Sequence, residues 1–243
     1  MWKTFAGHCI YQSTSGIRVF QNPIFRWLQF DSRAIQTLIN RYCPQKPGLS
    51  YIKSLIFAVT LQPESCCMLG LGGGGAAHAL SPLLGKDKLV IVERDDEVID
   101  VASRFFMINQ LENLSIIHQE ANLFIRECQT QFQHLLVDLF DANAFPTSCN
   151  NDEFFLHCKR LLKPGGILAV NLANRHEQWP IFQLIQKSFQ RSTIVLPVLD
   201  SPNMIVLAQN SDSMDTLLNR LKKNKTCKKI TWDSKWGCVA KIK

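Results

Sequence analysis

Four acidic residues at the ends of apolar segments have the chemistry to bind a cation and to move a proton. Glu93 ends one segment, Glu120 follows a second, and Asp138 and Asp141 end a third. A positioned carboxylate attracts an alkylammonium ion, whose pKa is about 10, and then takes its proton to leave a nucleophilic amine. Because a diamine carries two positive charges, the pair Asp138 and Asp141 predicts a diamine site. With an adenosyl sulfonium as the electrophile, the reaction would be alkyl transfer to nitrogen.

A run of four glycines, Gly72–Gly75, separates a predicted strand from a predicted helix. Glycines let the backbone turn tightly and approach a ligand that a Cβ would exclude. Glu93 lies about twenty residues further on, where a carboxylate can accept hydrogen bonds from ribose hydroxyls. The lysine of a phosphate-binding P-loop is missing, which argues against a triphosphate site. The loop and Glu93 therefore predict a nucleoside site. Nicotinamide and adenosyl ligands both fit it, and the alternatives are a plain turn and a solvated carboxylate.

The elements that must position these residues are strands that alternate with helices from Ser65 onward. The predicted strands are nearly continuous apolar runs: Cys66–Leu71, Leu89–Glu93, Leu114–His118, His134–Phe140, Ile167–Leu172, Thr193–Val198 and Met204–Ala208. The predicted helices include Ala76–Leu80, Glu97–Phe106, Asn151–Leu162 and Glu177–Gln190, and Lys163–Gly166 predicts a sharp turn. This alternation predicts an α/β fold with a mostly parallel, doubly wound sheet. Strand-end acids of such a sheet share one crevice.

A different pattern precedes this region and predicts a small separate domain. Ile17–Gln21 and Arg26–Phe30 alternate polar and apolar residues around a turn, as antiparallel strands do. A helix is predicted over Leu49–Leu61. The expected domains are a small β domain over residues 1–48, a Rossmann-like nucleoside-binding catalytic domain over 49–211, and a basic C-terminal helix and tail over 212–243.

The formal charge of +7 on the 243-residue chain is concentrated at its C-terminal end. Residues 220–243 contain nine basic residues and one acid, so residues 1–219 carry a formal charge of −1. A nucleic-acid binder spreads its charge over a face of the fold. Nucleic-acid binding is therefore not expected, and Asp212–Lys225 is interpreted as a helix with a solvated basic face.

Cellular context and metal content follow from what the sequence does not contain. No apolar run approaches the ~18 residues of a membrane span, and the N-terminus has no signal-peptide pattern. The nine cysteines form no Cys-x-x-Cys pair and lie mostly in apolar runs, which predicts buried free thiols in a reducing cytoplasm. The six histidines have no metal-ligand spacing either. We therefore expect a cytoplasmic protein with no membrane association and no metal site.

Taken together, these motifs resemble those of the polyamine aminopropyltransferase family, which includes spermidine synthase. The resemblance covers about Gly16 to Gln209 and depends on the order and spacing of five motifs. These are Gly72–Gly74, Val92-Glu93, Glu120-Ala121, Val137–Asp141 and the turn Lys163–Gly166. Asp31–Gln36 and Tyr51 are similar to two further family segments.

The resemblance implies a methyltransferase-type Rossmann-like fold with a small N-terminal β domain, and a homodimer. It implies aminopropyl transfer from decarboxylated S-adenosylmethionine, as a co-substrate and not a tightly bound cofactor, to a diamine such as putrescine. For the donor, the resemblance implies that Gly72, Gly73 and Gly74 approach the methionine-derived part, that Glu93 holds the ribose, and that Glu120 and Ala121 lie at the adenine. For the amine, it implies that Asp138 is the general base and that Gln36, Tyr51 and Asp141 bind the substrate.

The sequence departs from the family pattern in the amine half of the site. Gly75 stands where the family's glycine loop has an aspartate, and Ile52 and Lys53 replace the His and Glu that follow the tyrosine. The loop aspartate recognises the amine of a decarboxylated donor, so its loss favours S-adenosylmethionine itself. The alternatives to aminopropyl transfer are therefore an S-adenosylmethionine-dependent methyltransferase and a non-catalytic protein that binds a nucleoside or polyamine.

Overall fold

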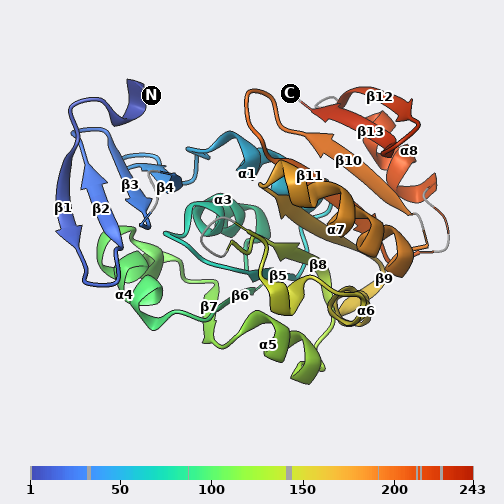
Figure 1. The fold of residues 1–243 in the computed structure, drawn as a ribbon, viewed down its shortest axis with the longest axis horizontal. Helices are drawn as coiled ribbons and strands as arrows, with labels where there is room; N and C mark the ends of the chain where they lie inside the picture. The colour runs from blue at the N-terminus through green and yellow to red at the C-terminus, as the bar shows by residue number, and fades with distance from the viewer. Residues whose placement is uncertain are drawn as a thin grey trace.

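A computed structural model describes residues 2–31, 34–86, 88–140, 144–190, 192–211, 213, 215–224 and 227–242 of the chain. In these ranges a four-stranded antiparallel sheet lies at one end of a nine-stranded mixed sheet (Figure 1). Helices cover the large sheet on both faces. The α/β fold and the small N-terminal β sheet predicted from the sequence are both confirmed.

The N-terminal sheet contains more strands than the two that the sequence predicts. A short 3-10 helix (Trp2–Thr4) precedes β1 (His8–Gln12), β2 (Arg18–Gln21), β3 (Phe25–Gln29) and β4 (Ile35–Asn40), which pair in that order. Val19, Leu28 and Ile39 point from this sheet into a small core shared with Val98 and Val101 of helix α4 (Asp96–Phe105). This core attaches the N-terminal sheet to the main domain and places β4 beside the site.

The large sheet has the order β12-β13-β10-β11-β9-β8-β5-β6-β7. Its strands are β5 (Cys66–Leu69), β6 (Leu89–Glu93), β7 (Leu114–His118), β8 (Phe132–Val137), β9 (Leu162–Leu172), β10 (Thr193–Pro197), β11 (Met204–Gln209), β12 (Cys227–Asp233) and β13 (Gly237–Ile242). Strands β7, β6, β5, β8 and β9 are parallel, whereas β11 is antiparallel to both β9 and β10.

Alternate side chains of the central strands point into two separate hydrophobic cores, one on each face of the sheet. Cys66 and Met68 of β5 face one core and Cys67 and Leu69 face the other, as the period of a strand requires. The first core contains α1 (Ser50–Leu55), α2 (Phe57–Leu61), α3 (Gly75–Leu84) and α8 (Asp215–Lys223). The second contains α5 (Ala121–Glu127), α6 (Asp152–Arg160) and α7 (Arg175–Ser188), while α4 (Asp96–Phe105) lies next to the N-terminal sheet. Short 3-10 turns cover Ile108–Gln110 and Thr147–Cys149.

Two local features differ from the sequence-based expectations. The helix predicted over Leu49–Leu61 is two helices that meet at Ile56, where the backbone leaves the helical conformation. Lys163–Gly166 was expected as a turn between a helix and a strand. It lies instead within β9, as a bulge opposite β8, and Gly165 and Gly166 exchange backbone hydrogen bonds with Asn210.

The basic C-terminal end contains a β-hairpin that the sequence analysis did not predict. After α8, strands β12 and β13 pair with each other, and β13 extends the large sheet by pairing in parallel with β10. Trp236 packs against Trp179 and Phe182 of α7, with ring centroids 5.2 Å apart in both contacts. Much of the basic charge is therefore carried by an ordered edge of the sheet. Within the described ranges, no helix is both long and apolar enough to cross a membrane.

The order of the parallel strands creates the crevice that the sequence predicts. The chain runs from β5 to β6 and β7 on one side, and then returns to β8 on the other side of β5. Ligands of open α/β sheets bind at such a reversal, beyond the carboxyl ends of the strands. Here β5 is followed by Gly70 and β8 by Asp138, whose backbone N–H donates to Leu69 (2.9 Å).

The close approach of these two strand ends requires a glycine at position 70. Its φ is +95°, and a Cβ there would lie 2.3 Å from the backbone oxygen of Asp138. We expect Gly70→Ala to lower the free energy of unfolding by about 2–4 kcal/mol, because it combines backbone strain with a clash. Gly85→Ala is the control: its φ is +60° with no atom within 4 Å, so it should cost only about 1 kcal/mol. Equal losses for the two variants in urea denaturation would contradict the close approach.

Candidate active site

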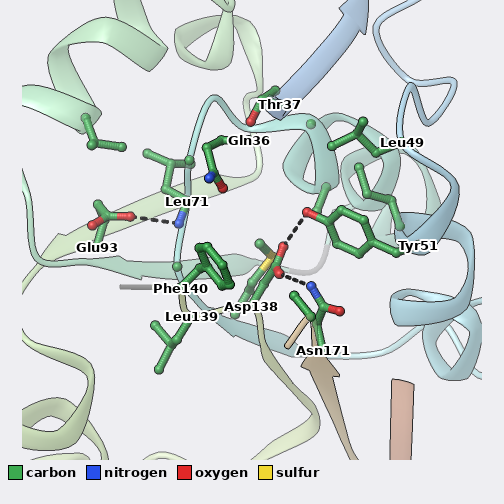
Figure 2. A pocket seen from close by; sticks show the side chains of 18 of the residues that line it. Gln36, Thr37, Leu49, Tyr51, Leu71, Glu93, Asp138, Leu139, Phe140 and Asn171 are labelled. Carbon is green, nitrogen blue, oxygen red and sulfur yellow. Dashed lines mark hydrogen bonds between the residues drawn. The ribbon is translucent and has the colours of Figure 1, made fainter. Parts of the chain in front are cut away.

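A cavity of about 400 Å³ opens at the carboxyl ends of β5, β6, β8 and β9, within the size range of small-molecule sites. The N-terminal sheet contributes to it through β4, and the β10–β11 turn closes another part of its wall. Of the residues predicted from the sequence, the following line it: Gln36, Tyr51, Gly72, Glu93, Glu120, Ala121 and Asp138. Figure 2 shows several of them around one space. Asp141, predicted to bind the amine, lies outside the described residues.

Asp138 is held by hydrogen bonds to both oxygens of its carboxylate (Figure 2). The hydroxyl of Tyr51, on α1, donates to Oδ2 at 2.9 Å. The side-chain amide of Asn171, on β9, donates to Oδ1 at 2.8 Å. Both donors are neutral and come from elements far apart in sequence, so the fold sets the orientation of the carboxylate.

The surroundings of this carboxylate shift its ionisation. Burial raises the pKa of Asp138 above its usual value, and the hydrogen bonds from Asn171 and Tyr51 offset part of that rise. The pKa of Tyr51 is also raised, first by burial and then by the nearby charge of Asp138. Tyr51 is therefore a neutral donor, and Asp138 has the raised pKa that suits a group that takes and returns a proton.

Glu93 holds the glycine loop to the neighbouring strand. Its Oε2 accepts the backbone N–H of Leu71 at 2.9 Å, and Oε1 accepts those of Arg94 (2.8 Å) and Asp95 (3.1 Å). Asp95 in turn caps α4 by accepting from Glu97 and Val98. These bonds fix Glu93 at the edge of the cavity. Oε1 accepts two N–H groups and Oε2 only one, so Oε2 retains lone-pair capacity for a ligand hydroxyl.

The glycine loop leaves the cavity wall at Gly73 and Gly74 and returns to it at Gly75. Gly73 donates its N–H to the hydroxyl of Thr37 on β4 at 2.8 Å. Gly74 has φ +76°, and a Cβ there would lie 2.3 Å from Ile108. Gly72 thus lines the cavity, whereas Gly73 and Gly74 contact the N-terminal sheet and the protein core. The three predicted ligand contacts of this loop remain predictions.

Glu120 and Ala121 lie at the start of α5, on the same side of the cavity as Glu93. The Glu120 side chain is 37% exposed, 4.0 Å from the guanidinium of Arg94, and accepts a 3.4 Å hydrogen bond from Ser148. Among the described lining residues, Glu93, Asp95, Glu120 and Asp138 are the acids and Arg94 is the base. This balance favours a cationic ligand. No cluster of His, Cys, Asp or Glu arranged for a metal occurs in the described ranges.

Sequence reasoning missed several polar residues of the site. Asn171 follows the apolar core of β9, Asn203 precedes β11, and Thr37 lies within β4. Asn171 is a polar residue at the carboxyl end of an otherwise apolar strand, which is the same signal that identified Asp138. Thr37 carried no such signal, because its contact with the glycine loop exists only after the two sheets meet.

Comparison with known proteins confirms the family resemblance. Residues 52–200 match the family model for the spermine/spermidine synthase domain. A polyamine aminopropyltransferase of Vibrio vulnificus is 26% identical over 83% of this chain and 75% of its own length. An eEF1A lysine and N-terminal methyltransferase homolog of Drosophila pseudoobscura pseudoobscura is 28% identical over 45% of this chain and 18% of its own length.

Two solved structures show the same fold. The spermidine synthase from Thermotoga maritima has a TM-score of 0.64 at 18% identity, and the match covers 89% of this chain and 78% of that structure. The human methyltransferase-like protein 13 in complex with SAH has a TM-score of 0.61 at 18% identity, covering 77% and 97% respectively. The fold is thus shared by synthases and methyltransferases. Because the family model matches more than half of the chain, the chain belongs to the spermine/spermidine synthase family of transferases.

Proposed function

We propose that this protein transfers an aminopropyl group from decarboxylated S-adenosylmethionine to a diamine such as putrescine. The observation that carries the proposal is the position of Asp138, which lies in one cavity with Gly72 and Glu93 and is held by two neutral donors. The amine nitrogen forms a bond to the aminopropyl carbon, the bond from that carbon to sulfur breaks, and methylthioadenosine leaves. The proton lost by the ammonium goes to Asp138.

The electrostatics of Asp138 support its role as the base. Its described hydrogen-bond partners are the uncharged groups of Tyr51 and Asn171, so burial of the carboxylate is not offset by a protein cation. An incoming ammonium supplies that missing charge, which favours binding. The raised pKa of the carboxyl then makes proton transfer from the ammonium less unfavourable than it would be to an exposed aspartate.

The nucleoside half of the donor fits the other side of the cavity. Glu93 lies at the end of β6, where its carboxylate is suited to ribose hydroxyls, and Glu120 and Ala121 border the space in which the base would lie. Homodimer formation and a cytoplasmic location remain predictions from the family resemblance and the sequence.

A second candidate is methyl transfer from S-adenosylmethionine, and the surroundings of Gly75 favour it. Gly75 lines the cavity, and a Cβ there would meet Thr37 at 3.3 Å and Ile52 at 3.4 Å. Neither neighbour is charged, so neither places a carboxylate beside the methionine-derived end of the donor. A zwitterionic donor would then not be repelled at this position, and the Drosophila relative is named as a methyltransferase homolog.

Replacing the proposed base tests the mechanism. We expect Asp138→Asn to lower kcat by about 10²-fold or more, because the amide cannot take the ammonium proton. Binding of the adenosyl donor should change little, since Glu93 and the glycine loop are untouched. Release of methylthioadenosine measures kcat, and calorimetric titration measures donor binding. A variant with wild-type turnover would eliminate Asp138 as the base.

The same substitution has a pH-dependent effect on stability whose sign follows from the raised pKa. Protonation of Asp138 stabilises the folded state; that stability is complete below the unfolded pKa of about 3.9 and is lost as pH rises through the higher folded pKa. Asp138→Asn removes this loss, so its Tm should exceed that of the wild type near neutral pH and approach it in acid. Glu120→Gln makes the same change of a carboxylate to an amide at a more exposed position and is the control. If the difference in Tm between Asp138→Asn and the wild type does not change with pH, Asp138 does not have the buried environment assigned to it.

A donor comparison separates the two candidate reactions. The purified protein is titrated with decarboxylated S-adenosylmethionine, S-adenosylmethionine and methylthioadenosine. Aminopropyl transfer predicts that the decarboxylated donor binds more tightly, because its net charge is one unit more positive and the described cavity lining is acidic. At least about fivefold tighter binding of S-adenosylmethionine would instead support methyl transfer. Gly75→Asp should then shift the preference toward the decarboxylated donor.

A further inference from the structure

A chain of side-chain hydrogen bonds extends from Asp138 into the β10–β11 turn. Asn171 donates to Oδ1 of Asp138 at 2.8 Å. The Oδ1 of Asn171 accepts from the amide of Asn203 at 2.8 Å, and the Oδ1 of Asn203 accepts from the hydroxyl of Ser201 at 2.5 Å. All four residues line the cavity. We call Ser201, Asn203 and Asn171 the amide chain.

The direction of every bond in the amide chain follows from the carboxylate at its end. An ionised carboxylate only accepts hydrogen bonds, so Asn171 must turn its NH2 group toward Asp138. Its carbonyl then faces Asn203, which must present an NH2 group in turn. The carbonyl of Asn203 faces Ser201, whose hydroxyl donates. Each amide is thus held in one orientation, and Asn171 always donates to the same oxygen of Asp138.

The backbone around the amide chain is also held firmly. Asn171 is 8% exposed and pairs with Ile205 across β9 and β11. Gln178 of α7 donates to the backbone oxygens of both Leu172 (3.0 Å) and Pro202 (2.8 Å). The turn is therefore tied to β9 by a second link that does not touch Asp138.

The two oxygens of Asp138 consequently differ in their capacity to take a proton. Oδ1 faces an amide NH2 group, which only donates, so Asn171 offers no acceptor for a proton on Oδ1. Oδ2 faces the Tyr51 hydroxyl, which can both donate and accept a hydrogen bond. Once Oδ2 is protonated, its O–H can donate to the Tyr51 oxygen, and the Tyr51 hydrogen turns away.

We propose that Asn171 is a positioning residue that reserves Oδ1 of Asp138 as a hydrogen-bond acceptor and leaves Oδ2, beside Tyr51, as the oxygen that takes the proton of the acceptor amine. The inference rests on the proposed role of Asp138 as the base. The ammonium proton moves to Oδ2, its electron pair stays on nitrogen, and the neutral amine attacks the donor carbon. Throughout this step, Asn171 keeps its hydrogen bond to Oδ1.

Infrared spectroscopy identifies the protonated oxygen without any need for turnover. The protein is labelled with ¹³C at aspartate carboxyls, and the signal of protonated Asp138 is assigned by its loss in Asp138→Asn. If Oδ2 carries the proton, C=Oδ1 still accepts from Asn171, so Asn171→Ala should raise the carbonyl stretching frequency by removing that bond. An unchanged frequency in Asn171→Ala would overturn the assignment of Oδ2. In Tyr51→Phe, Asn171 should still donate to the C=Oδ1 group of Asp138. The carbonyl stretching frequency should therefore stay lowered by that hydrogen bond.

The pH dependence of catalysis distinguishes positioning from simple support of the turn. Removing a donor to the carboxylate destabilises its charged form, so the acidic limb of the kcat profile should move to higher pH in Asn171→Ala. At neutral pH kcat should fall on the order of tenfold, with KM for the donor unchanged. Gln178→Ala loosens the same turn without touching Asp138, so it should lower Tm and leave the acidic limb in place. Equal movement of the limb in both variants would overturn the positioning role.

The two experiments keep this inference separate from the proposed function. A wild-type protein that turns over no amine would contradict aminopropyl transfer, while the infrared measurement would still decide whether Asn171 holds Oδ1. Asn171→Asp sharpens the test, because it replaces the donor with a second carboxylate of nearly the same shape. Repulsion between the new carboxylate and that of Asp138 should move the titration of Asp138 further toward high pH than Asn171→Ala does. A smaller movement than in Asn171→Ala would count against direct contact.

Discussion

The hydrogen bonds from Tyr51 and Asn171 to Asp138 are the interaction on which the rest of the site depends. A buried carboxylate is stable only when its oxygens are satisfied, and here both donors are neutral. The arrangement therefore keeps a negative charge ready for a cationic ligand without pairing it to a protein cation. It requires α1, β8 and β9 to converge within hydrogen-bond distance, which the strand order of the large sheet achieves.

The same convergence explains why the glycine loop and the N-terminal sheet are built as they are. The end of β5 approaches the end of β8 so closely that no side chain fits at Gly70. The loop that follows is held on one side by Glu93, through Leu71, and on the other by Thr37, through Gly73. The N-terminal sheet thus supports the loop, in addition to covering the cavity.

The charge of the molecule is divided between two regions with different roles. Among the described residues, the basic side chains of the C-terminal end lie on α8 and the β12–β13 hairpin, and β13 pairs with β10 at the edge of the large sheet. The described lining of the cavity is acidic, with Glu93, Asp95, Glu120 and Asp138 against Arg94. Net charge alone would suggest an anionic partner, whereas the local charge of the cavity suits a cationic ligand.

The sequence by itself determined the α/β class, the strand that ends at Glu93, the presence of a strand next to Asp138, and the family, because these features follow from apolar periodicity and from the order of motifs along the chain. Only the tertiary structure decided which side chains reach one another. Thr37 and Asn171 join the site through contacts across 36 and 33 residues of sequence, which no local pattern encodes. The hairpin after α8 escaped prediction for a related reason: its basic composition masks the alternation of a strand, and its stability comes from packing Trp236 against α7 and pairing with β10.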